Sequence, residues 1–212
     1  MADRPDRLPD APFPPGFFDR FDDQRDDVFY RPPRLVTHID DGAIAAVGAL
    51  YERLGLTGDV LDLMSSWVSH FRSPPASLTA LGMNAEELSR NPMATATVVH
   101  DLNVDPRLPF DDGVFDAVTC CASVDYLVRP VGVFRDVARV LRPGGPFVVT
   151  FSNRCFPTKA IRGWLAQDDT GRLAVVRRYF ERSGAFDPPT LAHCNPGAPG
   201  DPLYAAWATT ST

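Results

Sequence analysis

Short apolar runs recur along the chain between stretches of helical periodicity, and this alternation constrains the fold more than any other feature. The runs predict buried strands over residues 59–63, 77–81, 97–99, 115–121 and 146–151. Strands that alternate with helices across short loops rich in Gly, Pro and Asp indicate a parallel sheet covered on both faces. The sequence therefore predicts an α/β domain with a doubly wound sheet.

Helical periodicity separates and flanks these runs. Apolar residues from Leu35 to Leu54 recur every three or four positions and Gly55 follows, which is typical of an amphipathic helix and its end. A second apolar helical face, Val133 to Leu141, stops at a Pro-Gly-Gly sequence. Two further helices, over 159–166 and 171–183, and a last strand over 203–209 complete the predicted domain.

Composition limits the classes of partner. The 212 residues suit one domain, and 44% hydrophobic with 23% charged residues is typical of a soluble globular chain. A net charge of −6 argues against nucleic acid as a partner. No apolar run approaches the roughly 18 residues of a membrane span, and no apolar leader follows the start, so the expected location is cytoplasmic. The four cysteines show no metal-binding spacing, so no metal is expected, and the oligomeric state stays open.

The chain divides into two parts. Residues 1–33 contain eight Asp and seven Pro among six aromatic residues. Proline opposes regular structure, whereas so many aromatic residues are unusual in a free tail. We therefore expect a partly disordered N-terminal segment over residues 1–33 that can act as a lid, followed by the α/β domain over residues 34–212.

Polar residues follow several predicted strands. In open α/β sheets, ligands bind beyond the carboxyl ends of the strands. Asp62 lies near the end of the first strand, Gly82-Met83-Asn84 follows the second, and Asp101-Leu102 follows the third. The sequence thus predicts a ligand site at this edge of the sheet.

Two motifs carry a resemblance to a known family. Residues 108–118 read LPFDDGVFDAV, and residues 137–145 read VARVLRPGG before an apolar strand. With the order of the strand-end residues, they resemble the class I S-adenosylmethionine-dependent methyltransferases over residues 35–209. The resemblance implies a Rossmann-like methyltransferase fold, mostly parallel with an antiparallel C-terminal strand pair, and S-adenosyl-L-methionine as cofactor.

The first motif departs from that family. Met64, Ser66 and Val68 stand where the family usually has glycines, and Gly82 stands where an acidic residue usually holds the ribose. Pro74 and Pro75 predict a short first crossover helix. The sequence also resembles a methyltransferase-like group with the motifs DLMSSWVSH, GMNAEEL and SFSNRCFPTKA. Serine hydroxyls at a helix start can replace the glycine amides, and Asn84 can bind a ribose hydroxyl without charge.

The resemblance implies a set of cofactor-binding residues. Asp62 would hold the amino end of the cofactor, or simply orient its own loop; Asp101 would accept from the adenine amino group, or be an exposed turn residue. Arg34 would pair with the cofactor carboxylate, or be solvated. The complete predicted set is Arg34, Asp62, Met64, Ser65, Ser66, Gly82, Met83, Asn84, Asp101 and Leu102.

A second set concerns the acceptor. His38 is a candidate general base, since its ordinary pKa lies near neutral pH, although a single His at a helix start often caps or packs. Asn153 is the other candidate catalytic residue and would orient the acceptor, or tie its own loop. The predicted acceptor-binding residues are Tyr30, Tyr126, Arg154 and Lys159.

The function predicted is methyl transfer from S-adenosylmethionine to a small-molecule acceptor. Such a displacement depends mainly on in-line positioning, so the lack of a catalytic triad does not oppose it. Two alternatives stay open: an enzyme that uses the same cofactor for another displacement, and a non-catalytic binding protein. A nicotinamide dehydrogenase is disfavoured because G-x-G-x-x-G is missing.

Overall fold

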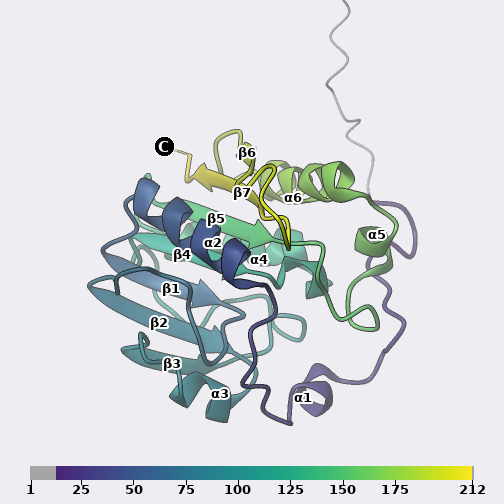
Figure 1. The fold of residues 1–212 in the computed structure, drawn as a ribbon, viewed down its shortest axis with the longest axis horizontal. Coiled ribbons are helices and arrows are strands. Elements are labelled where there is room, and N and C mark those ends of the chain that lie inside the picture. Colours follow the sequence, from purple (N-terminus) through teal and green to yellow (C-terminus); the bar gives the residue numbers. More distant parts are fainter. Residues whose placement is uncertain (1–12, 212) are drawn as a thin grey trace, which may run out of the picture.

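A computed structural model describes residues 13–211 and shows one seven-stranded sheet (Figure 1). The strand order is β3-β2-β1-β4-β5-β7-β6; β1 to β5 are parallel, while β7 is antiparallel to β5 and β6. This confirms the predicted fold class. The strands are β1 Asp59–Leu63, β2 Ser77–Gly82, β3 Ala96–Val99, β4 Ala117–Cys121, β5 Pro146–Phe151, β6 Thr190–His193 and β7 Tyr204–Thr209.

Helices of varied length connect and flank these strands. Asp40 caps α2 by accepting from the Ala43 amide, and Gly184, with φ of 66°, ends α6 in the left-handed conformation. The helices are α1 Asp26–Phe29, α2 Asp41–Arg53, α3 Ala85–Ser89, α4 Pro130–Val140, α5 Arg162–Leu165 and α6 Asp169–Ser183, with a 3₁₀ turn at Val124–Tyr126.

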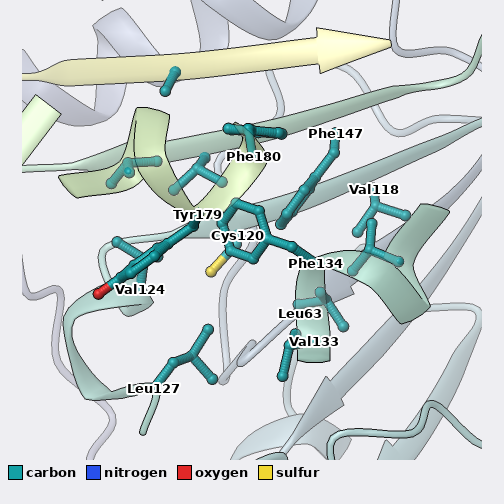
Figure 2. Packing of buried hydrophobic residues seen from close by; sticks show 14 of the residues in the cluster. Leu63, Val118, Cys120, Val124, Leu127, Val133, Phe134, Phe147, Tyr179 and Phe180 are labelled. Atoms are coloured by element: carbon teal, nitrogen blue, oxygen red, sulfur yellow. The ribbon is translucent and has the colours of Figure 1, made fainter. Parts of the chain in front are cut away.

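One face of the sheet is covered by α4 and α6. Because side chains alternate along a strand, β4 and β5 direct Cys120 and Phe147 to this face. Phe134 of α4 is fully buried there, with its ring 4.8 Å from that of Phe147 and 4.9 Å from that of Phe180 (Figure 2). We call β4, β5, α4 and α6 the apolar frame.

The other face is covered by α2. Val47 and Leu50 of α2 pack with strand residues such as Val60 and Val148, which alternate with those facing α4. Phe71, from the connection between β1 and β2, joins this second cluster. A loop residue thus covers part of the sheet that a crossover helix would otherwise cover.

The connection between β1 and β2 corrects one prediction. Residues 64–76 contain no helix, so the expected short crossover helix was wrong. Ser65 donates its amide to the Leu81 carbonyl at 2.8 Å, which draws the chain across the end of β2, and Pro74-Pro75 prevents helical hydrogen bonding farther on. The helix expected from Leu35 begins instead at Asp41, where Asp40 supplies its cap.

Residues 13–40 pass along the arrowhead ends of the parallel strands, with α1 at the lower right of Figure 1. Phe13, Phe17 and Phe18 pack against the cluster that contains Tyr179. The part of the N-terminal segment that was expected to be disordered, up to about residue 12, lies outside the described residues.

Candidate active site

A pocket opens at the carboxyl edge of the sheet, where β1 to β4 end. The loops after these strands form its floor, and the N-terminal segment forms its outer side. We call residues 19–40 and 62–70 together the polar wall. The pocket brings together most of the predicted residues: Tyr30, Arg34, His38, Asp62, Met64, Ser65, Ser66, Gly82, Met83, Asn84, Asp101, Leu102 and Tyr126.

Asp62 is buried and is held by three hydroxyl groups. Its Oδ2 accepts from Ser65 Oγ at 2.7 Å and from Ser69 Oγ at 2.6 Å, and its Oδ1 accepts from Thr119 Oγ1 at 2.7 Å. Asn91 donates in turn to Ser69 Oγ. The carboxylate thus fixes the loop after β1, and Oδ1 retains acceptor capacity.

Met64 begins that loop in a conformation that favours glycine. Its φ is 53°, in the left-handed region, at the first of the three positions where the resembling family usually has glycine. The backbone therefore keeps a glycine-like turn although the residue has changed. Such a conformation costs about 1 to 2 kcal/mol in a residue with a Cβ atom.

Gly82 is required by the course of the same loop. A Cβ atom built on Gly82 would lie 2.2 Å from the Ser65 carbonyl oxygen, closer than real Cβ atoms approach. No side chain can therefore occupy the place at which the family usually carries its ribose-binding carboxylate. The departure at Gly82 follows from the rebuilt first loop.

The serine hydroxyls do not replace the glycine amides in the way expected. No helix starts at Ser65 or Ser66, and both hydroxyls donate to carboxylates of the protein, Ser65 to Asp62 and Ser66 to Glu87. Asn84 also has protein partners: its amide donates to the Tyr30 carbonyl at 2.8 Å while its Oδ1 caps α3. These groups build the polar wall.

Glu87 lines the pocket, and the sequence analysis missed it. Its Oε1 accepts from the Arg34 amide and its Oε2 from Ser66 Oγ, both at 2.6 Å. The sequence signal was weak because Glu87 follows the strand end by five positions. Its neighbour Glu86 is exposed and pairs with Arg90.

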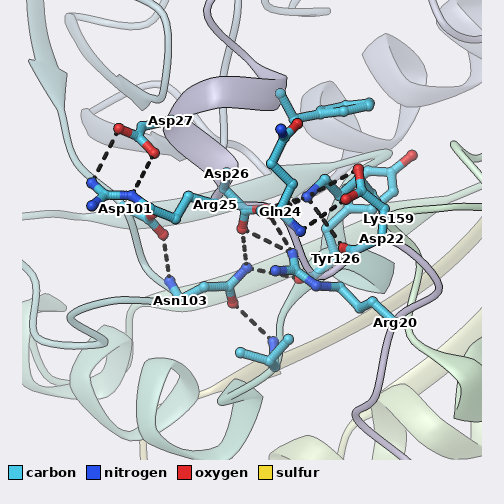
Figure 3. Close-up of polar contacts among 12 residues, drawn as sticks. Arg20, Asp22, Gln24, Arg25, Asp26, Asp27, Asp101, Asn103, Tyr126 and Lys159 are labelled. Carbon is cyan, nitrogen blue, oxygen red and sulfur yellow. Dashed lines mark hydrogen bonds and ion pairs between the residues drawn. The ribbon is translucent and has the colours of Figure 1, made fainter.

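Asp101 and Asn103 connect the end of β3 to the polar wall. Asp101 Oδ1 accepts from the amides of Asn103 and Val104, while its Oδ2 accepts no hydrogen bond from the described residues. Asn103 donates to Asp26 Oδ2 and to the Tyr126 carbonyl, both at 2.9 Å (Figure 3). Leu102 is buried between them and reaches the pocket.

Lys159 holds the N-terminal segment and does not line the pocket. Its side chain is fully buried, donates to the carbonyls of Asp22 and Gln24, and pairs with the carboxylates of Asp22 and Asp26 (Figure 3). Arg20 also pairs with Asp26. The structure thus places Lys159, predicted to bind the acceptor, away from the pocket, with its ammonium group hydrogen-bonded to the N-terminal segment.

Asn153 and Arg154 also lie outside the pocket. Both are exposed on the loop after β5, and Asn153 accepts from Ser152 Oγ. The pocket side of this loop is Phe156, whose amide donates to Tyr126 Oη at 2.8 Å. The structure therefore does not bring the two predicted acceptor residues to the pocket, because the chain turns outward directly after the strand.

Three histidines lie in the pocket lining, His100 and the more deeply placed His38 and His70. The His38 ring packs edge to face on Phe156 at 5.2 Å, and His70 lies on the loop after β1. Burial lowers the pKa of both from 6.5, and each has a carboxylate that opposes this, Glu87 for His38 and Asp62 for His70. Both imidazoles are therefore neutral at pH 7, with a nitrogen able to accept a proton.

The Arg34 guanidinium lies among aromatic rings at the rim. It stacks over Phe29 at 4.6 Å and lies 5.6 Å from the Phe156 ring, and it donates to the Phe29 carbonyl. Burial raises the pKa of Tyr30 beside it. This rim combines one fixed cation with flat apolar surfaces.

The pocket floor contains a buried polar atom without a partner. Tyr51 Oη lies beside Thr150 and Cys121, yet it forms no hydrogen bond with the described residues. Buried polar groups rarely lack a partner. With Asp101 Oδ2, this hydroxyl gives the lining polar atoms to which a polar organic ligand can hydrogen-bond.

The comparisons with known proteins agree with this geometry. Residues 56–149, from before β1 to within β5, match the family model described as "Methyltransferase domain". A 43-residue segment is 56% identical to a demethylmenaquinone methyltransferase of Mycolicibacterium gilvum and covers 20% of this chain and 19% of that protein. The chain thus aligns with about a fifth of that relative's length.

Solved structures show the same fold. A S-adenosylmethionine-dependent methyltransferase of Aquifex aeolicus superposes with a TM-score of 0.58 at 12% identity, over 80% of this chain and 92% of that one. The [4+2]-cyclase SpnF superposes with a TM-score of 0.57 at 14% identity, over 84% and 88%. Residues 56–149 match a methyltransferase domain, and the chain has the fold of the class I S-adenosylmethionine-dependent methyltransferases, as its motifs predicted. The cofactor of that family is the predicted one, S-adenosylmethionine.

The described residues contain no helix long and apolar enough to cross a membrane.

Proposed function

We propose that the protein transfers a methyl group from S-adenosylmethionine to a small-molecule acceptor. The observation that carries this proposal is the pocket at the carboxyl ends of β1 to β4, which gathers Asp62, Met83 and Asp101 within the segment that matches the methyltransferase domain. When bound, the cofactor supplies an electrophilic methyl group on a sulfonium. The protein's part is to hold the two reactants in line and exclude water.

Two groups of lining residues suit different parts of the reaction. Met83, Asp101 and Leu102 offer an apolar slot with one free carboxylate oxygen, which suits adenine and its amino group. His38 and Tyr126 form a second group in the lining, with both of their rings against Phe156. This group suits a flat acceptor, and neutral His38 can take up the proton that an acceptor hydroxyl or amine releases.

The fold alone does not decide the chemistry. SpnF, a protein named as a [4+2]-cyclase, shares the fold, so the alternative of a cofactor-binding enzyme with other chemistry keeps a specific observation in its favour. Release of S-adenosylhomocysteine together with a methylated product separates the two functions. Loss of cofactor without methyl transfer supports the alternative.

Calorimetric titration with S-adenosylmethionine and S-adenosylhomocysteine tests the proposal. We expect one site per chain, and Asp101→Ala to weaken binding about 10- to 100-fold through loss of a charged hydrogen bond. Asp105→Ala is the matched control, because Asp105 lies in the same turn but outside the pocket lining. A folded protein that gives no heat and no thermal shift with millimolar ligand would contradict the proposal.

His38 has its own test within this proposal. We expect His38→Asn to lower turnover with little change in cofactor affinity, because the imidazole belongs to the group that suits the acceptor. His193→Asn, at an exposed position in β6, is the control. Equal turnover of the His38 variant and wild type would assign His38 a packing role on Phe156.

A further inference from the structure

The carboxylate of Glu87 lies where three segments of the pocket meet. It comes from α3, accepts from the backbone of Arg34 in the N-terminal segment, and accepts from Ser66 in the loop after β1. Each of its oxygens thus takes one hydrogen bond from the protein. A carboxylate offers about four acceptor sites, so two remain for the pocket that Glu87 lines.

The contacts of Glu87 differ from those of an ordinary helix cap. Glu87 is the third residue of α3 after its N-cap, Asn84, a position from which a Glu side chain usually returns to the N-cap amide. Here only the backbone half of that arrangement forms, since the Glu87 amide donates to Asn84 Oδ1 at 3.1 Å. The side chain instead reaches into the pocket.

The end of β2 cannot supply a competing carboxylate. A Cβ atom on Gly82 would collide with the Ser65 carbonyl oxygen at 2.2 Å, and the next residues, Met83 and Asn84, carry no charge. In doubly wound nucleotide-binding folds, a carboxylate near the second strand commonly accepts from ribose hydroxyls. In the part of the pocket after β2, Glu87 is the acidic side chain that faces the ligand space.

We propose that Glu87 accepts the hydrogen bonds of the ribose hydroxyls of the bound cofactor, with Ser66 and the Arg34 amide fixing its carboxylate. This inference rests on the proposed function, because it takes the occupant to be an adenosine derivative. The acceptor function has moved from the strand end to the first turn of α3, as the rebuilt loop requires. Binding of the hydroxyl groups and closure of the polar wall then depend on one side chain.

The test compares ligands that differ by one hydroxyl. Calorimetry or competition measures the dissociation constants of S-adenosylhomocysteine and of its 2′-deoxy and 3′-deoxy analogues for wild type, Glu87→Gln and Glu86→Gln. Wild type loses about 10-fold or more in affinity for at least one deoxy analogue, as expected for a hydrogen bond to a charged group. In Glu87→Gln this penalty falls below about 3-fold. Glu86→Gln keeps the wild-type penalty, because Glu86 is exposed one residue away.

The dissociation constants of the deoxy analogues and of S-adenosylhomocysteine are compared within each variant. A general loss of stability therefore does not produce the same result. Where Glu87→Gln does not fold, Ser66→Ala frees the carboxylate from one partner and also lowers the penalty. A wild type that binds all three ligands equally, or a Glu87→Gln variant with an unchanged penalty, overturns the role of Glu87 and leaves the proposed function intact. A folded wild type that binds none of the ligands overturns both.

Discussion

The apolar frame and the polar wall are held by different forces. In the frame, Phe134 and Phe147 are fully buried and surrounded by other apolar side chains. The wall is held by hydrogen bonds and ion pairs, within it from Asp62 and to the rest of the chain from Glu87 and Lys159. Burial of apolar area is non-directional, whereas each polar contact needs its partner in one place. The frame therefore sets the fold and the wall sets the geometry of the site.

The largest expected effect lies in the frame. Phe134→Ala removes a ring that contacts Phe147, Tyr179 and Phe180, and we expect a loss of about 3 to 5 kcal/mol in the free energy of unfolding. Chemical denaturation measures it. A loss below about 1 kcal/mol would mean that the frame is not the main source of stability.

Lys159→Met tests the wall. It leaves acceptors of Asp22, Gln24 and the buried Asp26 without their donor. We expect a cost of about 2 to 3 kcal/mol, because Arg20 still pairs with Asp26. The distinguishing result is local: hydrogen exchange should rise across residues 19–30 and stay low in β4 and β5. Uniform loss of protection would show that frame and wall unfold as one unit.

The same exchange measurement tests the predicted lid. Residues 19–40 are tied down by Lys159, Asn84 and Asn103, so we expect protection of this segment before any ligand is added and a further increase with S-adenosylhomocysteine. Rapid exchange in both states would contradict the fixed wall and the lid alike.

Asp125 is buried in the 3₁₀ turn after β4 and makes stability depend on pH. Burial raises the pKa of its carboxyl from 3.8 to about 7, and its Oδ2 has no hydrogen-bond partner among the described residues. Between these two pKa values the folded chain therefore binds one proton more than the unfolded chain. The free energy of unfolding thus falls as pH rises from about 4 to about 7 and stays constant above that range.

Asp125→Asn removes this slope. Relative to wild type, we expect the variant to gain stability steadily as pH rises from 4 to 7 and no more above that range. Melting curves across pH give the difference directly. A difference in stability between variant and wild type that does not change with pH would show that Asp125 is not the group that binds the extra proton.

The smallest effect concerns Met64. Because its φ is 53°, Met64→Gly should be more stable than Met64→Ala by about 1 kcal/mol. At Val68, which does not have a positive φ, glycine should not be favoured over alanine. Equal stability of the two Met64 variants would show that the loop relaxes when the side chain is shortened.

The contrast between frame and wall also explains what the sequence could predict. The strand ends and the helix over 133–141 follow from hydrophobic periodicity, and they matched the structure within a few residues. The pocket could be located because parallel strands end at one edge. Asp62, Met83 and Asp101 were found in this way.

Glu87 and Lys159 could not be placed from periodicity. The loop after β1 passes over Gly82, and this brings Ser66 to the Glu87 carboxylate at the pocket. The Lys159 side chain is buried because the distant Asp22 and Asp26 pack against it and pair with its ammonium group. One signal was present: Lys159 is the chain's single lysine among many arginines. A compact ammonium group with three donors suits an enclosed site with several acceptors. The larger, planar guanidinium of an arginine does not fit such a site.

A crystal structure with S-adenosylhomocysteine would show whether the polar wall forms the cofactor pocket. We expect the ligand between the loop 64–70 and the residues after β3, with the adenine beside Asp101 and the contacts of Lys159 unchanged. A ligand bound elsewhere, or one that displaces the polar wall from the strand ends, would contradict the claim that this wall forms the cofactor pocket.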